Sequence, residues 1–289
     1  MVVSGGLLIL ILALLFERVQ GWLRLYLGRS PGTVFLPAIV LTAVFAAAAA
    51  GEGAFSVPLT LLAACYTLLP TLCVAVQRKA SRQPSLLDLV GILLLWLPLE
   101  FAAGASLVPR EAQGRLHANA YGIAILLALL LFLVIRGLDG LRYRLPKRAD
   151  CRNALAGFLI AAATLIPLGI WVGFLNKPHP LRVSAGTAVI RMAMILLGTA
   201  LPEEILFRGL IQNWLAQRLG RPQPAIIVAA VIFGCAHLNN APGPLPNWRY
   251  AIVATGAGLI FGEVFQASAS IFASALTHMG VNTVKYLFL

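Results

Sequence analysis

Three charged side chains lie within a short stretch of an otherwise apolar segment, "LPEEILFRG" at residues 201–209. A charged side chain at the centre of a bilayer costs about 2.5 to 3.5 kcal/mol, so such groups are normally paired and face a bundle interior or a wet cavity. On a helix, Glu204 and Arg208 are four residues apart, the spacing at which side chains meet. We therefore expect them to neutralise each other. Glu203 is turned about 100° away around the helix and needs a partner on another segment.

Two histidines on later hydrophobic segments are the candidate partners of Glu203, and the first is His237 in "FGCAH". The sequence "LGRPQP" contains Gly220 and a proline that end one helix and begin the next. Glu203 lies 17 residues before Gly220, and His237 lies 17 residues after it. At about 1.5 Å per residue, both lie roughly 25 Å from the turn on antiparallel neighbours. They are predicted to face each other.

The second candidate is His278 in "HMGVN", about ten residues beyond a tight turn expected near 267–269, or roughly 15 Å along its own helix. Asn282 is one turn further on the same face. These side chains are predicted to reach the same layer as Glu203 and His237. A buried polar network that only fixes helix register is the alternative, and it would contribute about 0.6 kcal/mol per interhelical hydrogen bond. The shared depth of the groups favours a functional site.

The composition identifies the kind of protein that carries these groups. The chain of 289 residues is 60% hydrophobic and 11% charged, whereas about a quarter of an ordinary soluble domain is charged. It is therefore expected to be an all-α, polytopic transmembrane helical bundle with about eight to ten membrane segments. The segments are predicted near residues 2–16, 33–50, 54–76, 86–108, 118–135, 153–175, 185–207, 224–238, 249–266 and 269–288. The first is interpreted as a retained span, because no positive region or cleavage site marks a signal peptide.

The net charge of +12 is best explained by membrane topology rather than by nucleic acid. Alternate connections, at 17–32, 77–85, 136–152 and 209–223, contain 14 Lys and Arg residues, and the other set contains only five. This bias places the first set in the cytoplasm and the N-terminus outside. We expect an integral multi-pass protein of a bacterial or archaeal cytoplasmic membrane.

The basic connection at 136–152 is taken as a boundary between an N-terminal transmembrane region (1–150) of unassigned role and a C-terminal domain (151–289). No internal repeat is evident, which disfavours transporter folds built from duplicated halves. The four cysteines have no pairing that indicates a disulfide framework or a thiolate metal site. Gly258 and Gly262 form a GxxxG pattern typical of close helix packing, with Glu263 interpreted as a snorkelling or capping group.

Three motifs follow one another on successive hydrophobic segments: EExxxR (Glu203, Glu204, Arg208), FxxxH (Phe233, His237) and HxxxN (His278, Asn282). In this order, across roughly residues 185–289, they resemble the CPBP family of intramembrane proteases. That family includes the type II CAAX prenyl endopeptidases, or Ras-converting enzymes. Each short motif is weak alone, but the ordered set is specific.

The resemblance implies peptide hydrolysis within the membrane by an activated water. Glu203 would be the general base and His237 would help to hold the water. His278 and Asn282 would stabilise the oxyanion, and Arg208 would pair with Glu204. No cofactor is favoured, because HExxH is absent. Zinc held by Glu203, His237 and His278 is the alternative.

The expected partners are membrane lipids and a membrane-tethered peptide or protein substrate, without nucleic acid, and the oligomeric state is left open. The substrate could carry a lipidated C-terminus, be a single-span precursor or be a leader peptide. Two other functions stay open. A proton-coupled transporter could use the same groups as a relay, and a non-catalytic immunity or scaffold protein would use them only for packing.

Overall fold

The chain is helical in the computed structural model, which describes residues 2–77, 81–176, 179–180, 183–240 and 244–288. No strand occurs among these residues, so the predicted all-α architecture is confirmed. Residues 78–80, 177–178, 181–182 and 241–243 lie outside the described residues, and they fall in the predicted connections between spans. The structure divides into two compact units, Met1–Asp139 and Gly140–Leu289.

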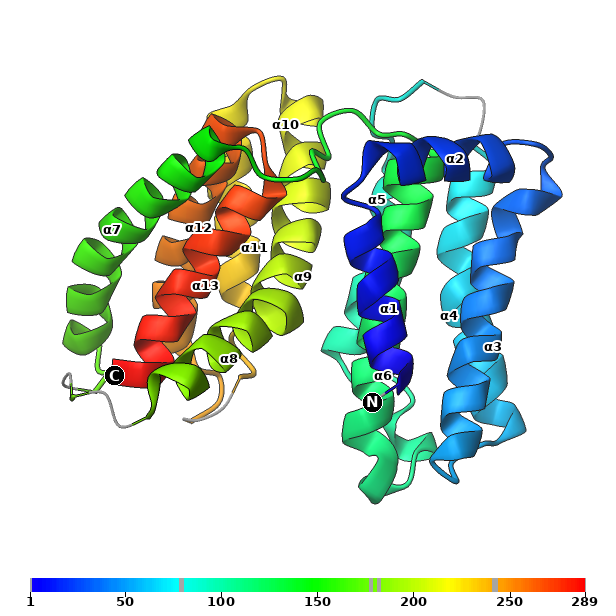
Figure 1. Cartoon of the computed structure of the whole chain (residues 1–289), viewed down its shortest axis with the longest axis horizontal. Helices are drawn as coiled ribbons and strands as arrows, with labels where there is room; N and C mark the ends of the chain where they lie inside the picture. Colours follow the sequence, from blue (N-terminus) through cyan, green and yellow to red (C-terminus); the bar gives the residue numbers. More distant parts are fainter. Residues whose placement is uncertain (1, 78–80, 177–178, 181–182, 241–243, 289) are drawn as a thin grey trace. The chain divides into compact units, whose positions relative to one another are not determined.

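The first unit is a bundle of helices (Figure 1). Its elements are α1 (Val2–Ala13), α2 (Glu17–Leu27), η1 (Gly32–Phe35), α3 (Leu36–Gly51), α4 (Val57–Ala75), α5 (Leu86–Glu100), η2 (Ala105–Leu107), α6 (Arg110–Ala128) and η3 (Leu129–Ile135). A buried, bidentate ion pair joins Arg136 to Asp88, with Nε–Oδ1 and Nη2–Oδ2 distances of 3.0 Å. It fixes the end of the α6–η3 helix against the start of α5.

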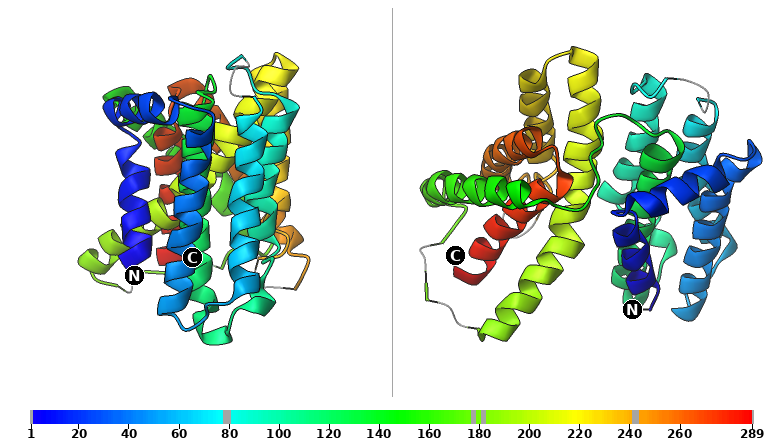
Figure 2. Two further views of the ribbon diagram at one scale, coloured as in Figure 1. Left: turned by 90° about the vertical axis from the view of Figure 1, so that its right-hand side faces the viewer. Right: turned by 45° about the horizontal axis from the view of Figure 1, so that its top comes forward.

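The second unit contains all of the candidate site residues. Its elements are α7 (Arg148–Trp171), α8 (Ala185–Ile195), η4 (Leu196–Ala200), α9 (Leu201–Glu204), η5 (Ile205–Gln212), α10 (Asn213–Leu219), α11 (Pro222–Cys235), α12 (Trp248–Ser268) and α13 (Ile271–Phe288). Figure 2 shows α8 to α10 as one continuous run of helix, with α11 returning beside it. The hairpin predicted at Gly220 is present, and its backbone has a positive φ of 65°. The turn between α12 and α13 is at Ala269, also with a positive φ, of 53°.

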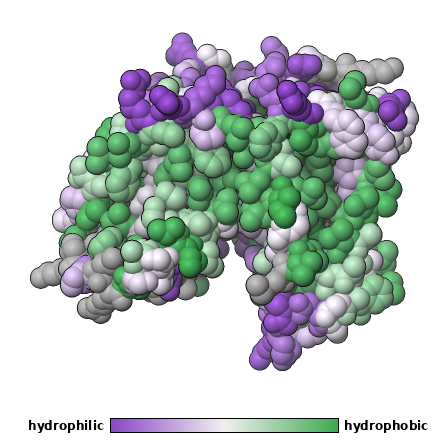
Figure 3. Space-filling model, viewed as in Figure 1, coloured by the Kyte–Doolittle hydropathy of each residue, from purple (hydrophilic) through white to green (hydrophobic). Residues whose placement is uncertain are grey.

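Six helices among the described residues are long and apolar enough to cross a membrane, or seven if the bent pair α1–α2 counts as one span. The helices α5 and α11 are apolar but have only 15 and 14 residues, below the roughly 20 that a straight crossing needs. In each unit, hydrophobic residues cover the sides of the helices and hydrophilic residues gather at helix ends (Figure 3). The chain is an integral, multi-pass membrane protein.

One predicted connection is instead largely helix. The segment from Gly209 to Leu219 continues the preceding span, and the helical run Ala185–Leu219 has 35 residues. The helix continues through Gly209, which permits close packing because a Cβ atom at this position would lie 2.7 Å from Ile271 Cδ1. The run contains two π-helical stretches, η4 and η5, on either side of the short α9 that carries Glu203 and Glu204. Such π-helical stretches are rare and frequently occur at functional sites.

Helices α11 and α12 pack closely through small residues, as the GxxxG pattern indicates. A Cβ atom at Gly258 would lie 2.9 Å from the Ala230 Cα, and one at Gly262 would lie 2.9 Å from Ile226 Cγ2. Glu263 is exposed on the same helix. The glycines therefore set the separation of the two helices, and with it the position of His237, just beyond the end of α11.

This packing predicts that Gly258→Leu lowers the free energy of unfolding by at least about 1 to 3 kcal/mol. The added side chain would meet the backbone of α11 at Ala230, which can move only together with the rest of that helix. The melting temperature in detergent should fall. The matched control is Gly198→Leu, since Gly198 is also helical and a Cβ atom added there would have no neighbour within 4 Å. Equal melting temperatures for the two variants would contradict the inferred role of Gly258.

Candidate active site

The buried centre of the site is the ion pair between Glu204 and Arg208. Glu204 Oε2 lies 3.0 Å from Arg208 Nε, and the exposed fraction of both side chains is 0%. The guanidinium also lies over the rings of Phe233 and Phe261, at 5.0 and 5.7 Å from their centroids. Such cation–π contacts add to the stabilisation of a desolvated charge. The pairing expected from the four-residue spacing is present.

Glu204 also connects α9 to α13. Its Oε1 atom lies 3.0 Å from His278 Nδ1, and its Oε2 atom accepts a hydrogen bond from the Ser274 hydroxyl. Both partners are buried, with the Ser274 residue 0% and the His278 residue 3% exposed. The carboxylate therefore has partners on both oxygens, which offsets the cost of burying it.

His278 is held on both of its ring nitrogens. Asn282 Nδ2, one helical turn further along α13, lies 3.0 Å from His278 Nε2. With Nδ1–H donating to Glu204 and Nε2 accepting from the Asn282 amide, the hydrogen bonds correspond to a neutral imidazole with its proton on Nδ1. The ring also stacks on Phe261, with centroids 4.6 Å apart. The orientation of the imidazole is thus fixed from three sides.

Glu203 lies beside this imidazole in a more open environment. Its Oε2 atom is 3.8 Å from His278 Nε2, and its side chain is 22% exposed, compared with 0% for Glu204. Two adjacent carboxylates therefore have different surroundings. Glu204 is locked into an ion pair, whereas Glu203 keeps access to the space around it. Different environments for neighbouring titratable groups are typical of acid–base sites.

His237 lies two residues beyond the end of α11. Its Nδ1 atom is 2.7 Å from the Phe233 carbonyl oxygen, so Nδ1–H donates and Nε2 is left as an acceptor. The ring contacts Tyr250 at 4.5 Å and Phe233 at 4.7 Å between centroids. Phe207, one turn after Glu203, packs edge-on against Phe233 at 4.9 Å. The two helices of the hairpin therefore meet at the depth that the equal spacing from Gly220 predicts.

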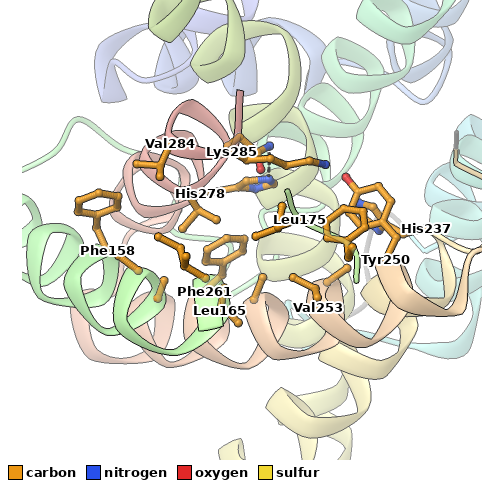
Figure 4. Close-up of a pocket in the computed structure, with 18 of the residues that line it drawn as sticks. Phe158, Leu165, Leu175, His237, Tyr250, Val253, Phe261, His278, Val284 and Lys285 are labelled. Atoms are coloured by element: carbon orange, nitrogen blue, oxygen red, sulfur yellow. Dashed lines mark hydrogen bonds between the residues drawn. The ribbon is translucent and has the colours of Figure 1, made fainter. Parts of the chain in front are cut away.

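His237, His278 and Asn282 line a largely apolar pocket with an empty volume of about 630 Å³, including its open mouth (Figure 4). Its polar lining residues are His237, Tyr250, His278, Asn282 and Lys285. The apolar lining comes from α7, α11, α12, α13 and the segment after α7, and comprises Phe158, Ala161, Ala162, Leu165, Ile166, Phe174, Leu175, Phe233, Val253, Ala254, Ala257, Phe261, Val281 and Val284. The pocket can therefore hold an apolar group while presenting a polar group to imidazole and amide side chains.

The alternative zinc set does not fit this arrangement. Within the described part of the chain, no group of three or more His, Cys, Asp or Glu side chains is placed to hold a metal ion. Both ring nitrogens of His278 already have partners, Glu204 and Asn282. To ligate a metal through Nε2, this imidazole would have to lose its contact with Asn282.

Three residues of the site were not singled out from the sequence. Ser274 is four residues before His278, on the same face of α13, so the i, i+4 rule could have found it. Tyr250 and Lys285 could not be assigned in this way. Tyr250 follows a connection, and Lys285 is a single cation near a helix end, where basic residues are common for reasons unrelated to catalysis.

The fold and site together define a class: a polytopic helical membrane protein in which a buried Glu204–Arg208 pair holds His278, and His278 and Asn282 line an apolar pocket. Residues 185–284 match the family model described as "Type II CAAX prenyl endopeptidase Rce1-like". This region, about a third of the chain, is therefore Rce1-like, and the resemblance based on the three motifs is confirmed. The match supports a CAAX-type intramembrane protease in general, which is a peptide hydrolase. No curated protein and no solved structure matches the chain.

The buried ion pair predicts a large, non-additive stability effect. Arg208→Met would leave Glu204 charged, buried and without its cation, which costs about 3 to 5 kcal/mol. Glu204→Gln combined with Arg208→Met removes both charges and should recover much of this loss. Thermal unfolding of Arg208→Met, Glu204→Gln and the double variant in detergent measures the coupling. Additive effects of the two substitutions would show that the pair does not stabilise the fold.

Proposed function

We propose that the chain is an intramembrane endopeptidase of the glutamate type, in which Glu203 activates water for attack on a peptide carbonyl. One observation carries this proposal: Glu203, whose side chain is 22% exposed, has its Oε2 atom 3.8 Å from the imidazole of His278, which Glu204 and Asn282 hold in place and which lines an apolar pocket. A network that only fixed helix register would have no need of a second, partly exposed carboxylate beside His278.

The reaction balances with the groups that are present. Glu203 takes a proton from water as the oxygen bonds to the carbonyl carbon, and a tetrahedral oxyanion forms. When the C–N bond breaks, the amine leaves with a proton returned by Glu203. Glu204 and Arg208 stay ionised throughout, because their charges cancel within the buried pair. Glu203 is thus the carboxylate that gains and loses the proton.

The other polar groups have distinct roles in this proposal. His237 holds the attacking water through Nε2, which is an acceptor because Nδ1–H donates to the Phe233 carbonyl. Asn282 has a second amide hydrogen that can donate to the oxyanion, and His278 orients that amide through Nε2. Donors that are fixed before the reaction stabilise a developing oxyanion most effectively where bulk water is excluded. Arg208 keeps Glu204 in place so that His278 stays aligned.

The substrate class follows from the pocket. Its apolar walls suit a membrane-tethered peptide, whose apolar anchor is at home among these side chains and whose backbone reaches the polar end. A prenylated C-terminal segment is the substrate that the family name indicates. A single-span precursor or a leader peptide belongs to the same class.

The proposal predicts that Glu203→Gln and His237→Ala each lower cleavage by about 100-fold or more, as expected for loss of general-base catalysis and of water positioning. Melting temperatures should change little, because neither residue belongs to the buried ion pair. Cleavage is measured with purified protein and a fluorescent prenylated peptide. The matched control is Glu263→Gln, an exposed carboxylate on α12, which should retain full activity.

Comparison of membrane peptidomes from cells with wild-type and Glu203→Gln protein would identify natural substrates. Accumulation of uncleaved precursors in the variant supports the proposal. Lost pH-dependent ion flux with an unchanged peptidome would indicate a proton-coupled transporter instead. Unchanged cellular function in both variants would indicate a non-catalytic protein.

A metal-independent reaction is the further expectation from the occupied nitrogens of His278. Activity should survive dialysis against a tight chelator, with less than a twofold change in rate. Activity that is lost on chelation and restored by zinc, in protein containing one zinc per chain, would contradict the glutamate mechanism.

A further inference from the structure

Lys285 lines the pocket about one helical turn beyond Asn282 on α13. Lys285 extends from α13 toward Tyr250 (Figure 4), and its Nζ atom is 4.3 Å from the centroid of that ring and 4.5 Å from the centroid of Phe174. The two rings are stacked, with centroids 4.6 Å apart. The ammonium group is therefore held at a defined place in the pocket rather than ranging freely in solvent.

The rings leave the hydrogen-bonding capacity of the ammonium unused. Lys285 has three N–H donors, and among the described residues no side chain or carbonyl accepts from them and no carboxylate forms an ion pair with them. Among the described residues no Asp or Glu contributes to the pocket lining, and Glu203 lies beside the lining residue His278 rather than in the lining itself. A half-buried cation with open donors, in a pocket without an acid, is complementary to an anionic group of a ligand.

We propose that Lys285 binds the free C-terminal carboxylate of the peptide substrate. The inference rests on the proposed protease function, because it names the part of the substrate that this end of the pocket recognises. A peptide backbone has no other anionic group, so a carboxylate at Lys285 fixes which end of the chain enters and how far. Lys285 then determines specificity without taking part in bond cleavage.

The spacing to the proposed water-binding histidine defines the length of peptide that this site accepts. The Lys285 Nζ atom is 4.3 Å from the Tyr250 centroid, and the His237 centroid is 4.5 Å from it, so the ammonium lies within about 9 Å of the imidazole. An extended peptide advances about 3.3 to 3.6 Å per residue. A carboxylate bound at Lys285 therefore places the bond beside His237 no more than two or three residues from the C-terminus.

The experiment uses two fluorescent peptides that differ in one group. Both carry a farnesylated cysteine followed by three apolar residues, and one ends in a carboxylate and the other in a carboxamide. Binding is measured with full-length Glu203→Gln protein in neutral-lipid nanodiscs, so that cleavage does not interfere. The acid should bind about 10- to 100-fold more tightly than the amide, the range for one charge-assisted contact. Adding Lys285→Met should reduce the acid-to-amide affinity ratio to about one, mainly by weakening the binding of the peptide that ends in a carboxylate.

The control is another cation that is held by an aromatic ring. Arg191 on α8 lies 4.3 Å from the centroid of Tyr286, the residue after Lys285, and does not line the pocket. Arg191→Met should keep the full acid-to-amide ratio. Lys285→Arg should keep part of it. If the role of Lys285 were purely structural, Lys285→Met would weaken the binding of both peptides equally and leave the acid-to-amide affinity ratio unchanged.

The outcomes separate this inference from the protease proposal. Equal affinity of the two peptides, no binding of either, or a ratio that survives Lys285→Met overturns the carboxylate site. Cleavage of both peptides by the wild-type protein with equal kcat/KM also overturns it while the protease proposal stands. Acid-selective binding that depends on Lys285, without cleavage by the wild-type protein, supports the site and contradicts the protease. A Lys285 effect that appears only with anionic lipids would assign the residue to a headgroup and overturn the inference.

Discussion

The buried ion pair between Glu204 and Arg208 is the constraint on which the C-terminal unit depends. Both charges lie on one helical run, but their remaining contacts reach the other helices. Glu204 binds Ser274 and His278 on α13, while Arg208 lies over Phe233 of α11 and Phe261 of α12. Because an unpaired charge is so costly inside an apolar bundle, each of these contacts favours one relative placement of the helices. The pair thereby links stability to the geometry of the site.

The same constraint explains why the motif contains two carboxylates. A carboxylate that pairs with Arg208 cannot also exchange protons freely, since losing its charge would leave the guanidinium uncompensated. Glu204 supplies the fixed charge, and Glu203, with 22% of its side chain exposed, is available for chemistry. The flanking π-helical stretches η4 and η5 accompany this arrangement. Two successive residues can thus present one carboxylate to the packed interior and the other to the neighbourhood of His278.

The sequence predicts those features that depend on local rules. The spacing of Glu204 and Arg208, the turn at Gly220 and the small-residue packing at Gly258 all follow from helix geometry, and all are present. Features that depend on tertiary packing were missed or misjudged. The connection predicted at 209–223 is instead largely helix, and Gly209 packs closely against Ile271 of α13. The contact of His278 with Glu204 depends on how α13 packs, which spacing along single helices does not determine.

The polarity of the pocket lining restricts the kind of ligand that fits it. Its walls are apolar, and the polar groups that the described residues contribute to the lining are an amide, two imidazoles, a phenol and an ammonium, with no carboxylate among them. Burial in the apolar lining is favourable for an apolar anchor. Burial of a charged terminus is favourable only where a fixed counter-charge compensates the lost hydration. Lys285, held between Phe174 and Tyr250, supplies that counter-charge near His237. A ligand that is apolar at one end and anionic at the other would match this lining, so under the proposed function the distribution of polarity would select the direction in which a peptide binds.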